Sequence, residues 1–139
     1  MKLETLFADT NLFLRYLTND VPEQADAVER SLRRAAAGEL RLMTSALVVG
    51  EIIWTLESFY GLPKQTVREH VLAMLNTPGL EVAEADILLQ AILWYEEKNV
   101  DFIDAYNAAW LLAGGLNRIA TFDRKHFARF EGLSVIVPG

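Results

Sequence analysis

The sequence predicts an α/β protein with a short, mostly parallel sheet, because short apolar runs alternate with longer amphipathic segments along its 139 residues. Each run is followed by a segment with helical spacing, and glycine or proline marks the ends of many segments, which is typical of strands joined by helical crossovers. We expect helices on both faces of the sheet. No internal repeat, low-complexity tract or linker interrupts the pattern, so the whole chain, 1–139, is expected to form one domain.

The expected strands are 5–8, which we expect to be buried, 41–44, 80–83, 118–121 and 134–137. The expected helices are 11–17, 22–37, 46–60, 63–75, 86–98, 104–113 and 124–130. Pro22 is tolerated in a first helical turn, and Gly38 and Gly61 are typical helix stops. Ser45 is the expected N-cap of the third helix, whose apolar face carries Val48, Ile52, Leu56 and Phe59.

Composition excludes several classes of protein and of site. Apolar residues make up 52% and charged residues 23% of the chain, which favours a globular protein over a disordered one. Cysteine is absent, which excludes disulfides, thiolate metal ligands and cysteine nucleophiles. The first ten residues do not resemble a signal peptide, and no run approaches the roughly 18 apolar residues of a membrane helix. We therefore expect a soluble, cytoplasmic protein.

The net charge of −6 argues against a simple nucleic-acid-binding module, which is usually basic. Basic residues are nevertheless bunched, once in 30–41 and once in 118–129, and local patches matter more than the sum. A cluster of metal-binding carboxylates would also account for part of the negative charge.

Four acidic residues stand at or near the ends of expected elements. Asp9 and Asp123 follow strands, Asp104 opens a helix with Asp101 one turn before it, and Glu51 lies in a helix that follows a strand. The C-terminal ends of parallel strands share one edge of the sheet, where open α/β sheets place their sites. Carboxylates gathered there would repel one another, and a divalent cation would relieve that repulsion.

Helix capping is the competing explanation for three of these acids. Asp9, Asp101 and Asp123 each precede an expected helix, where a cap contributes about 0.5–2 kcal/mol. Asp104 can instead face the positive end of a helix dipole. Glu51 lies too far inside its helix for either role, so its side chain either points to solvent or meets a cation.

Clustered carboxylates favour a hard, oxygen-binding ion such as Mg²⁺ or Mn²⁺. No zinc motif is present, and His70 and His126 are isolated in sequence, so we interpret both as surface histidines, although His126 can also touch a phosphate. No serine or threonine has a histidine placed by motif to activate it. A phospho-receiver domain is disfavoured because Asp9 lacks the acidic neighbours of that family.

Four stretches of the chain resemble PIN-domain ribonucleases, and more narrowly the toxins of VapBC-type toxin–antitoxin pairs. They are, in order, Ala8 to Tyr16, Ser45 with Val49 to Leu56, Asp101 to Ala105, and Thr121 to Lys125. The resemblance covers nearly the whole chain. It implies a three-layer α/β/α sandwich with a short, mostly parallel central sheet.

The resemblance also implies a metal site for Mg²⁺, with Mn²⁺ as the alternative. Its expected catalytic ligands are Asp9, Glu51, Asp104 and Asp123, with Asp101 as a secondary ligand or a cap and with Asn11 and Thr121 orienting the acids or the phosphate. The expected partners are an RNA substrate, a cognate antitoxin and a second copy of the chain.

We expect Arg15, Arg124 and Lys125 to contact the RNA backbone, because local basic residues can hold RNA despite an acidic total. The main alternative is a non-catalytic interaction module with the same fold, in which the acids are caps and an apolar stretch binds a partner. That stretch contains Trp54, Leu56, Phe59, Tyr60 and Leu62, of which we expect most to pack in the core and a rim to be exposed.

Overall fold

Strands and helices alternate along residues 3–139, the part of the chain that the computed structural model describes. The strand pairs of this part are all parallel, which confirms the predicted α/β class. Contacts divide the chain into two units, one ending at Ala85 and one spanning 86–139. The expected single domain stays a prediction, and each unit is described separately.

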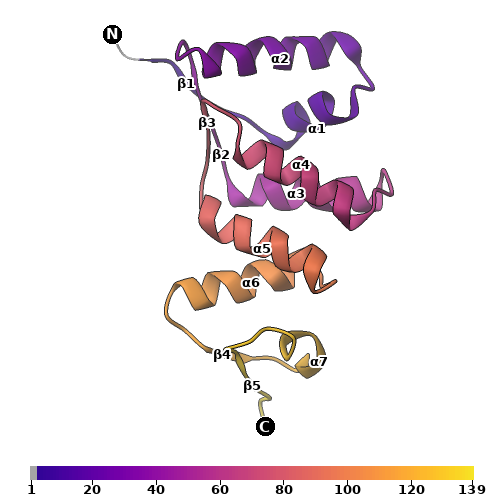
Figure 1. The fold of residues 1–139 in the computed structure, drawn as a ribbon, viewed down its shortest axis with the longest axis vertical. Helices are drawn as coiled ribbons and strands as arrows, with labels where there is room; N and C mark the ends of the chain where they lie inside the picture. Colours follow the sequence, from indigo (N-terminus) through magenta and orange to yellow (C-terminus); the bar gives the residue numbers. More distant parts are fainter. Residues whose placement is uncertain (1–2) are drawn as a thin grey trace. The chain divides into compact units, whose positions relative to one another are not determined.

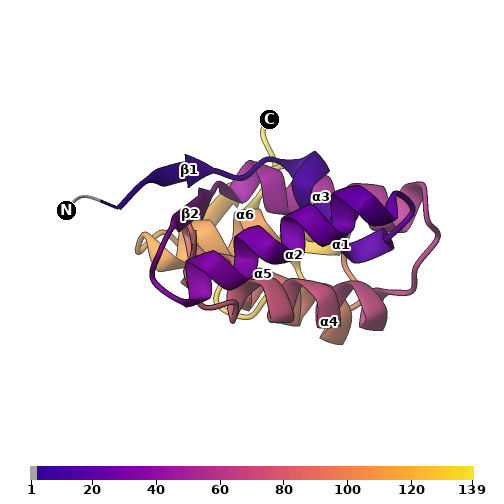
Figure 2. The ribbon, with the colours of Figure 1, turned by 90° about the horizontal axis from the view of Figure 1, so that it is seen from above.

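The first unit contains a three-stranded parallel sheet in the order β1-β2-β3. Figure 1 labels its strands and helices. Its elements are β1 (Thr5–Phe7), α1 (Thr10–Thr18), α2 (Pro22–Ala36), β2 (Arg41–Thr44), α3 (Ala46–Ser58), α4 (Lys64–Leu75) and β3 (Leu80–Val82). Helix α1 packs against α2 and α3, and α3 packs against α4 (Figure 2). Both α2 and α4 contact β3. These bounds lie within two or three residues of those expected from periodicity.

One face of this sheet is buried and the other is open. Leu42 of β2 pairs in register with Leu80 of β3, and both side chains are buried. On the opposite face Phe7 pairs with Met43, and Phe7 is 62% exposed. The expectation that 5–8 forms a buried strand is therefore wrong for β1, since all three of its residues are exposed. The cause is its place at the sheet edge, where it has one neighbouring strand, so an apolar sequence does not by itself imply burial.

Helix α3 follows the predicted pattern closely. The Ser45 hydroxyl accepts a hydrogen bond from the Val48 amide at 3.3 Å, which confirms the N-cap. Val48, Ile52 and Leu56 are buried, as their spacing predicts. Phe59, expected on the same face, is 77% exposed instead, because the helix ends at Ser58 and Phe59 is its C-cap.

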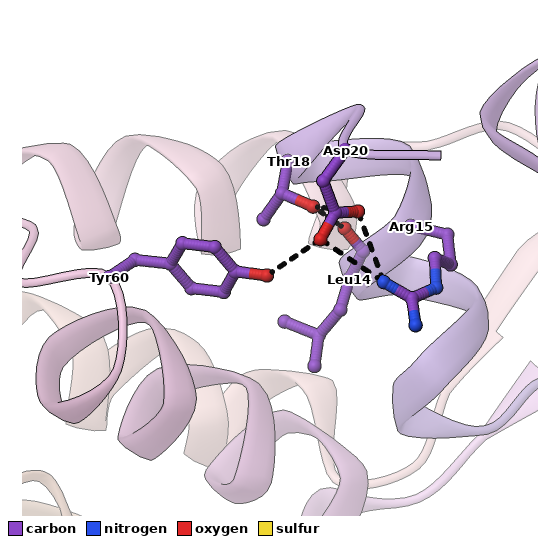
Figure 3. Close-up of polar contacts among 5 residues, drawn as sticks. All are labelled: Leu14, Arg15, Thr18, Asp20 and Tyr60. Atoms are coloured by element: carbon purple, nitrogen blue, oxygen red, sulfur yellow. Dashed lines mark hydrogen bonds and ion pairs between the residues drawn. The ribbon is translucent and has the colours of Figure 1, made fainter. Parts of the chain in front are cut away.

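A polar cluster around Asp20 joins the end of α1 to the segment after α3 (Figure 3). Both carboxylate oxygens of Asp20 lie 3.1 Å from Arg15 Nη1, and the Thr18 and Tyr60 hydroxyls lie 3.0 and 3.2 Å from the same carboxylate. These contacts hold the pKa of Asp20 below its ordinary value, with the Thr18 hydrogen bond as the largest cause. The cluster fixes the Asn19 turn, where the backbone has a φ of 52°.

We expect Asp20→Asn to lower the melting temperature at pH 7 by a few degrees, because the amide cannot pair with the Arg15 guanidinium. A folded-state pKa below the unfolded one contributes stability above the unfolded value, about 3.9, and loses it as pH falls through the folded value. The difference between variant and wild type should therefore vanish in strong acid. Thermal unfolding from pH 2 to 8 measures it, with the exposed Asp26→Asn on α2 as the control; a pH-independent difference would contradict the ion-pair account.

The second unit contains a separate pair of parallel strands. Its elements are α5 (Ala85–Glu97), α6 (Phe102–Ala113), β4 (Arg118–Ala120), α7 (Arg124–Phe127) and β5 (Ser134–Ile136). The sequence predicts one central sheet, whereas β4 and β5 pair with each other in a sheet apart from β1-β2-β3. Periodicity predicts that a strand exists but not which strand it pairs with, which is why the division was not foreseen.

The core of this unit contains aromatic side chains among its aliphatic ones. Tyr95 packs edge-on against Phe102, and their ring centroids lie 6.1 Å apart. The ring centroids of Trp94 and Phe130 lie 5.2 Å apart. Phe102 is buried at the first position of α6, so the helix begins two residues earlier than expected and places Asp104 in its first turn. Within residues 3–139, no helix has both the length and the apolar character that crossing a bilayer requires.

Candidate metal centre

Asp9 lies directly after β1, held there by bonds to β2. The amide of Ala8 donates to the Met43 carbonyl at 2.8 Å, and the Ala8 carbonyl accepts from the buried Thr44 hydroxyl at 2.7 Å. Asp9 Oδ1 then accepts from the Leu12 amide at 3.1 Å, so the capping role is confirmed. Asp9 Oδ2 accepts no hydrogen bond from residues 3–139, so this oxygen of the exposed carboxylate is open to a ligand.

Glu51 lies on the exposed face of α3. Its neighbours on that face, Leu47 and Trp54, are 81% and 67% exposed. No hydrogen bond or ion pair of the described chain engages its carboxylate. The free-energy cost of burying this charge therefore does not arise, because the carboxylate is exposed and open to a cation. The role of Glu51 as a metal ligand stays a prediction.

In the second unit, Asp104, Asp123 and His126 come together. Each offers a donor atom, and among residues 3–139 these three atoms lie within 4.8 Å of one another. Asp104 is in the first turn of α6, while Asp123 and His126 begin and line α7. Two helices and the end of β4 thus place two carboxylates and an imidazole around one point.

The pKa of Asp104 is raised at this position. Partial burial raises its pKa above the ordinary value, and the negative charges of Asp101 and Asp123 raise it further. His126 acts in the opposite direction. Asp101 has the extended backbone of an N-cap, but its side chain makes no capping bond, so its carboxylate contributes charge rather than a cap.

Asp123 is held from three directions. Its backbone amide donates to the Thr121 hydroxyl at 2.9 Å, its Oδ1 accepts from the His126 amide at 3.2 Å, and its Oδ2 lies 2.7 Å from His126 Nδ1. The histidine contact is the main reason why the pKa of Asp123 is lowered. Capping of α7 is confirmed. Thr121 holds the backbone of Asp123, and its role in orienting the acids or the phosphate stays a prediction.

The other predicted residues differ in how accessible they are. Arg124 and Lys125 are exposed on α7, next to the cluster. Asn11 is exposed on α1. Arg15 is paired with Asp20, and its Nε is buried without a hydrogen-bond partner among the described residues (Figure 3). Its contact with RNA stays a prediction, as do those of Arg124 and Lys125.

The donor set fits a divalent cation. Carboxylate oxygens suit Mg²⁺ and Mn²⁺, and the pKa of Asp104 is raised first by burial and then by the charges of Asp101 and Asp123, whose repulsion a cation would relieve. His126 is expected from sequence to be a surface histidine that can also touch a phosphate, whereas the structure places it beside Asp104 and Asp123. The signal that could have found it is its spacing of three residues from Asp123, which places both side chains on one side of a helical turn.

The chain matches the PIN domain family over residues 6–133. It belongs to that family. PIN domains have a small α/β/α fold and are generally metal-dependent nucleases, and PIN nucleases bind RNA. The match spans both units and includes Asp9, Glu51, Asp104 and Asp123. A search of curated proteins finds no match.

Proposed function

We propose that this PIN domain is a Mg²⁺-dependent endoribonuclease, with Mn²⁺ as the alternative ion, and that it is the toxin of a toxin–antitoxin pair. The observation that supports the nuclease most directly is the group of Asp104, Asp123 and His126, whose donor atoms lie within 4.8 Å of one another in a chain that matches the family over residues 6–133. The toxin role rests on the resemblance to VapBC toxins.

In this proposal Asp104 and Asp123 hold the ion, and Asp9 and Glu51 of the first unit join them as further ligands. Thr121 fixes the backbone of Asp123, and Asn11 orients an acid or the phosphate. When bound there, a divalent ion would supply Lewis-acid chemistry: it would lower the pKa of an attacking water and neutralise charge on the scissile phosphate. Arg124 and Lys125 bind neighbouring phosphates, which places the substrate strand beside the carboxylates.

Cleavage of RNA by the purified chain tests the nuclease. We expect a mixed RNA substrate to be cut at millimolar Mg²⁺ or Mn²⁺ and to stay intact in EDTA. Expression of the wild type should arrest growth, and Asp9→Asn should relieve the arrest while accumulating to the same level. The proposal is overturned if RNA stays uncut with both ions and Asp9→Asn changes nothing in cells.

Localised cleavage of the protein itself tests whether all four acids share one ion. Fe²⁺ bound in place of Mg²⁺ generates hydroxyl radicals with ascorbate and peroxide, and these cut only nearby backbone. We expect cuts close to residues 9, 51, 104 and 123, mapped by mass spectrometry, and their loss on addition of excess Mg²⁺. Cuts confined to the segments around 104 and 123 would remove Asp9 and Glu51 from the site.

The proposed toxin role also implies partner proteins. We propose a cytoplasmic homodimer that is inhibited by a separate antitoxin chain; a short reading frame upstream of the gene, encoding a DNA-binding N-terminus, is the expected source. Co-expression of that frame should restore growth, and light scattering of the purified chain should give twice the monomer mass.

The alternative, a non-catalytic interaction module, is favoured by two observations. Asp9 and Asp123 are caps, and Trp54 and Phe59 are exposed, although Leu56 of the same stretch is buried. Calorimetric titration with Mn²⁺ separates the two functions, because a module whose acids serve only as caps would bind no ion.

A further inference from the structure

We infer that His126 is itself a metal ligand, and that its nitrogen makes the centre prefer Mn²⁺ and the later transition metals over Mg²⁺ more strongly than carboxylates alone would. The inference rests on the proposed metal centre and adds a residue and an ion preference to it. From sequence alone His126 is expected to be a surface histidine.

The placement of the imidazole supports direct binding. Its Nδ1 lies 2.7 and 2.9 Å from the two carboxylate oxygens of Asp123, and its side chain is 48% exposed. The donor atoms of Asp104, Asp123 and His126 lie within 4.8 Å of one another. Ligands about 2.1 Å from one six-coordinate ion lie about 3 Å apart when adjacent and about 4.2 Å apart when opposite. The three donors therefore have the spacing of a shared coordination shell with little movement.

The backbone limits how far the ring can move away. The His126 amide donates to Asp123 Oδ1 at 3.2 Å, and the Asp123 amide donates to the Thr121 hydroxyl at 2.9 Å. These bonds keep the two residues on one turn, so a cation that binds the Asp123 carboxylate meets the imidazole as well. The ring can bind through one nitrogen as a neutral ligand while the other nitrogen keeps the proton.

The nitrogen has a chemical consequence. Mg²⁺ strongly prefers oxygen donors, whereas imidazole suits manganese less well than it suits cobalt, nickel or zinc but better than it suits magnesium. An imidazole beside two carboxylates thus raises the affinity for transition metals and leaves that for Mg²⁺ nearly unchanged. The competing role is positioning, in which His126 orients Asp123 by a hydrogen bond and affects every ion equally.

Spectroscopy on the full chain distinguishes a ligand from a positioning residue. Electron spin-echo experiments on bound Mn²⁺ give a strong ¹⁴N coupling when a nitrogen is coordinated and a much weaker one when a nitrogen only lies nearby. The chain has two histidines, so His70→Gln, in the first unit, is the matched control for His126→Gln. We expect a nitrogen coupling in the wild type and in His70→Gln and its loss in His126→Gln. With ¹⁵N-labelled histidine, Zn²⁺ should shift the ring resonances of His126 and leave those of His70 in place.

Binding constants complete the test. We expect His126→Gln to weaken Mn²⁺ and Co²⁺ binding about tenfold and Mg²⁺ binding by less than about threefold. Equal losses for all ions, or bound Mn²⁺ without nitrogen coupling in the wild type, would overturn the inference and leave the proposed nuclease standing. Failure of the wild type to bind any divalent ion would overturn both. If His126→Gln does not fold, the Mn²⁺ spin-echo and ¹⁵N histidine spectra of the wild type and His70→Gln still show whether His126 coordinates the ion.

Discussion

Asp104→Asn is expected to reduce the rate of RNA cleavage by about 100- to 1,000-fold or more, the range seen when one preorganised electrostatic group is removed from an active site. Asp104 is the half-buried member of the cluster, and its carboxylate is the one that the charges of Asp101 and Asp123 perturb. Asparagine keeps the size of the side chain but removes its charge. Initial rates on a single RNA substrate at saturating Mg²⁺ and Mn²⁺ measure the loss.

The control for this variant is Asp86→Asn, which makes the same chemical change on an exposed residue in the first turn of α5. We expect its cleavage rate to match the wild type. A second comparison is Asp101→Asn, which should cause a smaller loss, because Asp101 acts through its charge on Asp104 or as a secondary ligand. If Asp104→Asn and Asp86→Asn cleave at the same rate, Asp104 is not part of the machinery.

Features of the fold that depend on residues close in sequence could be predicted, whereas features that depend on distant residues could not. Ser45 as a cap, the buried face of α3 and the stops at Gly38 and Gly61 follow from contacts within a few residues, and the structure bears them out. The exposure of β1 and the pairing of β4 with β5 depend on residues far along the chain. Local sequence patterns carry no information on strand partners, which is why these two features were missed.

In the candidate site, too, contacts between residues close in sequence are easier to predict than contacts between distant ones. Asp123 and His126 are three residues apart and share a turn, so their contact could have been predicted from spacing. Asp104 reaches them from another helix; the family resemblance implies that Asp104 and Asp123 share a site, and the structure places the donor atoms of all three residues within 4.8 Å of one another. The sequence also predicts Asp9 and Glu51 as ligands, and their participation stays a prediction. The caps at Asp9 and Asp123 also show that one carboxylate can both end a loop and offer an oxygen to an ion, so capping and metal binding are not exclusive.

Divalent ions are expected to stabilise the fold, and Asp104→Asn is expected to remove that effect. An ion that binds the native state alone at a concentration 100 times its Kd contributes about 2.7 kcal/mol, which corresponds to about 10 °C in melting temperature for a domain of this size. Thermal unfolding of the wild type and the variant with 0 to 10 mM Mn²⁺ or Mg²⁺ measures the shift. Ca²⁺-free buffer with EDTA provides the zero point, and Asp86→Asn should shift like the wild type.

Without metal, Asp104→Asn should be more stable than the wild type at neutral pH, although it gains nothing from added ions. Because the folded-state pKa of Asp104 is raised, its favourable contribution is complete below the unfolded pKa and is lost as pH rises through the folded value. At neutral pH the ionised carboxylate therefore destabilises the metal-free fold. Asp104→Asn should be as stable as the wild type in acid and more stable at pH 7. A loss of stability at pH 7 in EDTA would instead mean that the ionised side chain supports the first turn of α6.

Asp123→Asn separates repulsion from capping within the same cluster. The pKa of Asp123 is lowered, so its ionised form contributes stability that is present above the unfolded pKa and lost as pH falls through the folded value. In EDTA at pH 7 this variant should be less stable than the wild type, while Asp104→Asn is more stable. Both should lose the shift with Mn²⁺. Opposite effects without metal and the same effect with metal would mean that the two carboxylates share an ion, since no account based on local helix stability predicts that combination.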